Sequence, residues 1–195
     1  MSKYVDKTTN TINRYVAKNK QLSPEELWLA RGSLATAAIN SVLQNIKPGS
    51  TIIELGSGFS TKLFSQYYSI YAVEHDLKWL EHKIDGVNYI HAPLKEYKPF
   101  FSDKELWYDV EVLKRELPID YEAIIVDGPS GSKFSRYGFV HNLDIFKRCN
   151  VLFDDVHAVN VYMVMIETMN KWQVNNALLY NIERDKAFAW INGNE

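Results

Sequence analysis

The sequence predicts an α/β protein: a Rossmann-like, seven-stranded, mostly parallel sheet with helices on both faces and an antiparallel C-terminal hairpin. Short apolar runs alternate with helical patterns along the chain, which is typical of β-α-β units. A turn with two glycines at residues 56–58 joins the first of these runs to a helix. The 195 residues, of which 46% are hydrophobic, are enough to bury one large core.

The individual elements follow from apolar runs and from capping and turn residues. Four polar residues at 183–186 separate the last two apolar runs, which predicts the hairpin. The stretch between Pro93 and Pro118 is rich in aromatic residues and fits either a lid or substrate wall or the packing of an irregular crossover. The expected strands are Thr51–Leu55, Ile70–Glu74, Tyr89–His91, Ala123–Asp127, Val151–Asp154, Ala177–Asn181 and Ala187–Ile191. The expected helices between them are Thr61–Tyr68, Leu77–Lys83, Lys104–Leu117, Phe139–Lys147 and Val159–Trp172.

Two segments are expected, an N-terminal arm or leading helix at residues 1–22 and one domain at residues 23–195. A capping box at Ser23, Pro24 and Glu26 starts a helix that runs to about Leu43. The net charge of the chain is −2, and because the arm is basic, the body is more acidic than that. An acidic body argues against a nucleic-acid partner, although the arm could contact an anion.

The composition also indicates where such a protein resides. No apolar run is long enough to span a membrane, and the polar first residues do not resemble a secretory signal. One cysteine, Cys149, excludes an internal disulfide framework. We therefore expect a cytoplasmic protein without a membrane span.

The segment that starts at Glu54 carries the strongest functional signal. Its sequence, Glu-Leu-Gly-Ser-Gly, includes Gly56, Ser57 and Gly58, and it leads from a strand into a helix whose free N–H groups would face a ligand. Glu74 ends the next strand, where an acidic residue accepts hydrogen bonds from ribose hydroxyls. Thr61 replaces the third glycine of the dinucleotide fingerprint, which disfavours NAD and FAD.

These motifs and the strand pattern resemble the class I S-adenosylmethionine-dependent methyltransferases over residues 25–193. The resemblance implies that the glycine loop, with Gly56, Ser57 and Gly58, holds the methionine part of S-adenosylmethionine. It also implies that Glu74 binds the ribose and that Glu54 lies near the amino-acid end. His75 would line the cofactor site, and Asp127 would border it.

A second group of acidic residues follows the fourth and fifth strands. Asp127, Asp154 and Asp155 should lie at the same edge of the sheet, and oxygen ligands suit Mg²⁺ or Mn²⁺. This pattern resembles the metal-dependent O-methyltransferases, including those that act on sugars. In that family the ion binds the substrate hydroxyls, and here His157 or Asp127 would take the proton. Helix capping by one aspartate and a plain turn at Asp127 are the alternatives.

The Asp-Gly-Pro sequence at Asp127 also resembles the glucuronoxylan methyltransferases over a short stretch. That resemblance implies that Lys133 and Arg136 hold a carboxylate or phosphate of the substrate. We therefore expect an O-methyltransferase that acts on a hydroxyl of a sugar or glycan precursor, with a small-molecule or glycan substrate and no nucleic acid. The apolar helix after the fifth strand and the edge hairpin are surfaces that could form a homodimer. A metal-free methyltransferase and a non-catalytic cofactor-binding scaffold are the alternatives.

Overall fold

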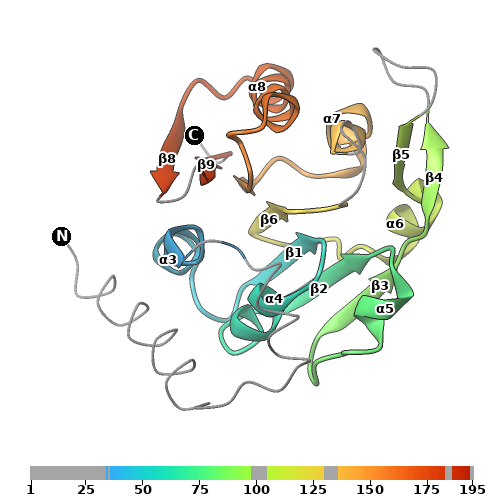
Figure 1. Cartoon of the computed structure of the whole chain (residues 1–195). Coiled ribbons are helices and arrows are strands. Elements are labelled where there is room, and N and C mark those ends of the chain that lie inside the picture. The colour runs from blue at the N-terminus through green and yellow to red at the C-terminus, as the bar shows by residue number, and fades with distance from the viewer. Residues whose placement is uncertain (1–33, 35, 98–104, 130–135, 183–185, 194–195) are drawn as a thin grey trace.

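A computed structural model describes residues 34, 36–97, 105–129, 136–182 and 186–193. Its main sheet has seven strands in the order β3-β2-β1-β6-β7-β9-β8, in which β9 runs antiparallel to both of its neighbours (Figure 1). The sheet contains β1 (Thr51–Leu55), β2 (Ser69–Glu74), β3 (Asn88–His91), β6 (Ala123–Val126), β7 (Asn150–Phe153), β8 (Ala177–Ile182) and β9 (Lys186–Ile191). The predicted Rossmann-like, mostly parallel sheet with an antiparallel C-terminal hairpin is therefore confirmed.

The helices that follow β1 are shorter than the sequence patterns suggest, except for the last. They are α3 (Thr36–Asn45), α4 (Phe59–Phe64), α5 (Leu77–Leu80), α6 (Val110–Glu116), α7 (Tyr137–His141), a 3₁₀ turn (Leu143–Ile145) and α8 (Val159–Trp172). The expected helix over 139–147 is thus divided, since Asn142 ends α7 with a cap that donates back to the Gly138 carbonyl. The arm at residues 1–22, the capping box at Ser23 and most of the helix expected to follow it lie outside the described residues.

The sheet separates two apolar cores, as the strand alternation requires. On one face, α3 and α4 pack against side chains that include Ile52, Ile125 and Leu152. On the other face, α6, α7 and α8 cover side chains that include Leu55 and Phe153 (Figure 1). Helices therefore lie on both faces, and the central strands β1, β6 and β7 between them are almost entirely buried.

The expected helix over 104–117 is wrong in its first half. Glu105–Tyr108 forms strand β5, which pairs antiparallel with β4 (Leu94–Tyr97) in a separate two-stranded sheet. Alternation explains the strand, because Glu105 and Trp107 are buried while Leu106 between them is exposed. Asp109 then caps α6, accepting a hydrogen bond from the Glu111 N–H at 3.1 Å.

No helix within the described ranges is long and apolar enough to cross a membrane.

Candidate functional site

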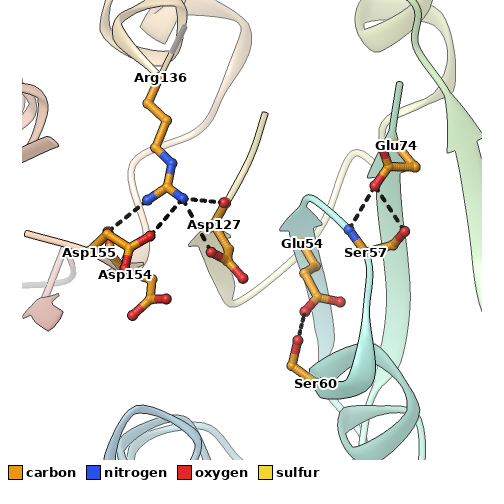
Figure 2. A network of polar contacts seen from close by, with 8 residues as sticks. All are labelled: Glu54, Ser57, Ser60, Glu74, Asp127, Arg136, Asp154 and Asp155. Atoms are coloured by element: carbon orange, nitrogen blue, oxygen red, sulfur yellow. Dashed lines mark hydrogen bonds and ion pairs between the residues drawn. The ribbon is translucent and has the colours of Figure 1, made fainter. Parts of the chain in front are cut away.

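The site lies where the carboxyl ends of four parallel strands meet. β1 pairs with β2 and β6, and β6 pairs with β7, so the residues that end these strands share one edge of the sheet. The ladder continues into the site, because the N–H of Asp127 donates to the Leu55 carbonyl and the N–H of Asp154 donates to the Val126 carbonyl, both at 3.1 Å. Figure 2 shows the carboxylates of Glu54, Glu74 and three aspartates gathered along this edge. Open α/β sheets bind their ligands at such an edge.

The glycine turn requires a glycine at position 56 for two different reasons. Gly56 has φ +101°, in the left-handed region that side chains disfavour. A Cβ on Gly56 would also lie 3.2 Å from the backbone nitrogen of Gly128, so the loops after β1 and β6 touch through their backbones. The N–H of Gly58 donates to the Thr61 hydroxyl at 2.9 Å, which fixes the first turn of α4. The two loops therefore meet at Gly56 and Gly128, where neither residue has a side chain.

Glu74 is the most strongly hydrogen-bonded carboxylate of the site. Its Oε2 accepts from the N–H of Ser57 at 3.1 Å and from the Ser57 hydroxyl at 3.0 Å (Figure 2). Its Oε1 accepts from the N–H groups of His75 at 2.7 Å and Asp76 at 2.9 Å. Burial alone would raise the pKa of Glu74, but hydrogen bonds from the His75 side chain and these N–H groups lower it below its usual value. Glu74 is thus an ionised acceptor held toward the glycine turn.

Glu54 is buried at the end of β1 with only one of its oxygens engaged. Its Oε1 accepts from the Ser60 hydroxyl at 2.7 Å, while Oε2 is buried and has no hydrogen-bond partner in the described structure (Figure 2). Burial raises the pKa of Glu54 to about 7, against the lowering effect of the Thr61 and Ser60 hydroxyls. A buried carboxylate oxygen without a partner is costly, and a donor from a ligand would remove that cost.

The acidic cluster, defined here as Asp127, Asp154 and Asp155, forms as the sequence suggests. One carboxylate oxygen from each of the three lies within 4.8 Å of the others. Side chains of adjacent residues normally point to opposite faces, but Asp155 has φ +59° because the chain turns there, and both aspartates of the pair reach the cluster. Burial raises the pKa of Asp127 well above its usual value, and Asp154 raises it further while Arg136 lowers it.

Arg136 fills the space between these carboxylates. Its Nη2 lies 3.3 Å from Asp127 Oδ1 and 3.1 Å from Asp155 Oδ2, and its Nη1 donates to the Asp154 carbonyl at 2.9 Å (Figure 2). The sequence analysis assigned Arg136 to a substrate anion, but the structure turns its guanidinium inward onto the protein's own acids. Lys133, its predicted companion, lies outside the described residues.

The predicted histidines occupy different places. His75 stands beside Glu74, with Nδ1 2.9 Å from Glu74 Oε1, and its ring meets that of Tyr108 edge-on at 6.1 Å. His157 is exposed, and its Nδ1 accepts from the N–H of Ala187 on β9 at 3.4 Å. No contact joins His157 to the acidic cluster in the part of the chain that the structure describes, so the structure adds nothing to its predicted role as a base.

Two further residues belong to the site. Ser60, which had no role in the sequence analysis, donates a hydrogen bond to Glu54 from the first turn of α4. Tyr108 is one of the aromatic residues of the stretch between Pro93 and Pro118, for which the sequence left a lid, a substrate wall and core packing open. The structure buries Tyr108 on β5 with its hydroxyl close to Gly128.

Comparisons with known proteins agree with the fold. No family model matches the sequence, and no curated protein matches it. Among solved structures, an rRNA methylase from Streptococcus thermophilus is similar with a TM-score of 0.54 at 12% identity, covering 81% of this chain and 95% of that one. The methyltransferase PaMTH1 from Podospora anserina, solved with bound S-adenosylhomocysteine (SAH), gives 0.53 at 15% identity, covering 96% and 95%. The METTL16 methyltransferase domain gives 0.52 at 16% identity, covering 89% and 69%.

The comparisons define the class of fold as that of S-adenosylmethionine-dependent methyltransferases, and they correct one expectation. We expected a small-molecule or glycan partner and no nucleic acid. That expectation is wrong, since an rRNA methylase shares the fold over most of this chain. The net charge of the chain was a poor guide to a nucleic-acid partner, because it does not show where positively charged side chains gather on the surface.

Proposed function

We propose that this chain is an S-adenosylmethionine-dependent methyltransferase whose cofactor lies along the edge from Glu74 to Asp127. The observation that carries the proposal is Glu54, whose Oε2 is buried without a partner beside the glycine turn. The amino group of the cofactor is a cation of the kind that this oxygen needs. Ligand-binding edges of this type recur in the fold that the chain shares with known methyltransferases.

The residues of the site fit the cofactor in three respects. The backbones of Gly56 and Gly128 leave room for close approach, because neither carries a Cβ. Glu74 is an ionised acceptor suited to ribose hydroxyls, and the Ser57 hydroxyl that it now binds is free to turn away. Glu54 offers a carboxylate oxygen to the amino group at the methionine end of S-adenosylmethionine. When bound, S-adenosylmethionine supplies a methyl group that its sulfonium makes reactive.

The chain's own contribution is to align the acceptor, exclude water and remove a proton. Asp127 is the group that accepts the proton of the methyl acceptor. Burial and the neighbouring Asp154 raise its pKa and so make it a stronger base than an exposed aspartate. Its place at the end of β6, where Gly128 meets the glycine turn, puts it beside the proposed cofactor site. The acceptor is then a hydroxyl or another protic group that approaches from the side of Asp127.

The acidic cluster is also a candidate site for a divalent ion. Its residues do not fit an ion in the arrangement that the structure shows. The three acidic oxygens are close enough for one ion. However, Nη2 of Arg136 already lies 3.3 Å from Asp127 and 3.1 Å from Asp155, so an ion would have to displace the guanidinium. The acidic cluster therefore does not fit a divalent ion while Arg136 occupies it.

A methyl-transfer assay tests the proposal. Labelled S-adenosylmethionine is incubated with the protein and total RNA, which the similarity to an rRNA methylase makes the first acceptor class to try. We expect label in the acceptor with the wild type and none with Glu54→Gln/Glu74→Gln. Cofactor binding without transfer to RNA, proteins or small hydroxyl compounds would favour the scaffold alternative.

A further inference from the structure

Arg136 forms more contacts inside the acidic cluster than an exposed substrate-binding arginine would. Its Nη2 lies 2.5 Å from the Asp127 carbonyl, 3.3 Å from Asp127 Oδ1 and 3.1 Å from Asp155 Oδ2. Its Nη1 donates to the Asp154 carbonyl at 2.9 Å. The side chain is only 11% exposed, so most of it is withdrawn from solvent. Figure 2 shows the guanidinium above the gap between Asp127 and Asp155.

These contacts are the ones that a divalent cation would make. Mg²⁺ and Mn²⁺ bind carboxylate and carbonyl oxygens, and the guanidinium engages two carboxylates and two carbonyls here. A guanidinium stays charged at every pH that a folded protein tolerates, and its fork geometry suits several oxygens at once. Solvent ions therefore compete with a cation that is tethered to the same chain.

We propose that Arg136 is the resident cation of the acidic cluster. It takes the place between Asp127 and Asp155 that a divalent ion would need, and it thereby makes the cluster of the wild-type protein insensitive to Mg²⁺ and Mn²⁺. Removing the guanidinium converts the cluster into a divalent-cation site. This inference concerns the cluster alone and does not depend on the methyltransferase proposal.

The bonds to main-chain oxygens give Arg136 a second effect. By binding the carbonyls of Asp127 and Asp154, the guanidinium ties the ends of β6 and β7 together. The backbone of Arg136 is itself anchored, because its carbonyl accepts from the N–H of Phe139 in α7 at 3.1 Å. Arg136 is thus a positioning residue for Asp127, acting from the start of α7.

The test is a Mn²⁺ titration followed by calorimetry and by the electron paramagnetic resonance of free Mn²⁺. We compare the wild type with Arg136→Gln, Arg136→Lys and Arg115→Gln. Arg115 is the matched control, because its change removes the same charge from an exposed side chain that pairs with Glu116. We expect one Mn²⁺ site in Arg136→Gln, with affinity raised by about tenfold or more over the wild type. Arg115→Gln should behave like the wild type, and Arg136→Lys, which keeps the charge but loses the fork, should gain less Mn²⁺ affinity than Arg136→Gln.

Two further measurements make each outcome decisive. Adding Asp155→Asn to Arg136→Gln should abolish the gained Mn²⁺ site, which places the ion in the cluster. A wild-type protein that binds one Mn²⁺ and loses it in Asp155→Asn would overturn the proposal, whether or not Arg136→Gln folds. Folded Arg136→Gln with no gain in Mn²⁺ affinity would overturn it as well. A circular dichroism melt of each variant establishes that it is folded.

Discussion

The hydroxyl of Tyr108 lies where a side chain on Gly128 would begin: a Cβ built on Gly128 would be 2.5 Å from that oxygen. The same Cβ would be 3.0 Å from the Cα of Gly56. The hydroxyl itself is buried and has no hydrogen-bond partner among the described residues. The Tyr108 hydroxyl on strand β5 therefore lies directly against Gly128, at the edge of the proposed cofactor site.

Gly128→Ala should destabilise the protein by about 1–3 kcal/mol, because the methyl group overlaps Tyr108 and the Gly56 backbone. Tyr108→Phe alone should change stability by about 1 kcal/mol or less, since the lost hydroxyl has no partner. Urea denaturation of both single variants and the double variant checks this. We expect partial rescue in the double variant, because the contact with Gly56 remains. If the changes in the free energy of unfolding of the two single variants add up fully in the double variant, the added methyl group does not clash with the Tyr108 hydroxyl.

Glu74→Gln should weaken SAH binding by about 10- to 100-fold, the effect of losing hydrogen bonds to a charged acceptor. The amide has one acceptor oxygen where the carboxylate has two, so it cannot accept from the Ser57 N–H and from the N–H groups of His75 and Asp76 at the same time. Isothermal titration calorimetry with SAH measures the change. Glu122→Gln, the same substitution at an exposed position, is the control. An equal loss of SAH affinity in Glu74→Gln and Glu122→Gln would mean that the change in net charge weakens binding, and not the loss of a contact at Glu74.

Glu54 should make stability depend on pH near neutrality. Its pKa rises from 4.5 to about 7 on folding, so its contribution is fully present below pH 4.5 and is lost as pH rises through about 7. Glu54→Gln cannot ionise, and its stability should change less over that range. Denaturation of both proteins in a series of buffers measures the difference. Parallel curves would show that Glu54 ionises at an ordinary pH.

The same carboxyl group should release a proton when the cofactor binds. A cationic amino group beside Glu54 favours its ionised form, so binding at a pH just below 7 should expel a proton in the wild type. Calorimetry with SAH in two buffers of different ionisation enthalpy detects it. Glu54→Gln should show no difference between the buffers. If the wild-type protein releases no proton when SAH binds, the amino group of SAH does not lie beside Glu54.

Asp127→Asn should reduce methyl transfer by about 100-fold or more while SAH still binds. His157→Gln should have little effect, because His157 is exposed and its Nδ1 faces the Ala187 N–H. Single-turnover rates with a saturating cofactor compare the two variants. A larger loss in His157→Gln than in Asp127→Asn would return the role of base to the histidine.

Much of the fold was predictable because the signals were local. The central strands β1, β6 and β7 are short apolar runs that are almost entirely buried, whereas the edge strands β3 and β8 are partly exposed. Strand β1 has the predicted bounds Thr51–Leu55. The placement of Glu54, Glu74 and the acidic cluster at one edge followed from parallel pairing alone. A parallel sheet aligns the carboxyl ends of its strands whatever the rest of the chain does.

What could not be predicted depended on contacts between distant segments. Strand β5 was expected to be part of a helix over residues 104–117, and its pairing with β4 is a contact between segments that local patterns do not show. The orientation of Arg136 follows from the ends of β6 and β7, which are close in space and far apart in sequence. A sequence motif identifies a charged side chain, but it does not say whether the charge faces a substrate or the protein's own acids.

The measurement that tests the account most directly is a thermal melt of the wild type and Glu74→Gln with and without SAH. At about 100 times its Kd a ligand stabilises the folded state by roughly 2.7 kcal/mol. For a chain of this length the account predicts a rise in Tm of about 5–10 °C for the wild type and a smaller one for Glu74→Gln. No rise in the wild type, or the same rise in both proteins, would contradict a cofactor site at this edge of the sheet.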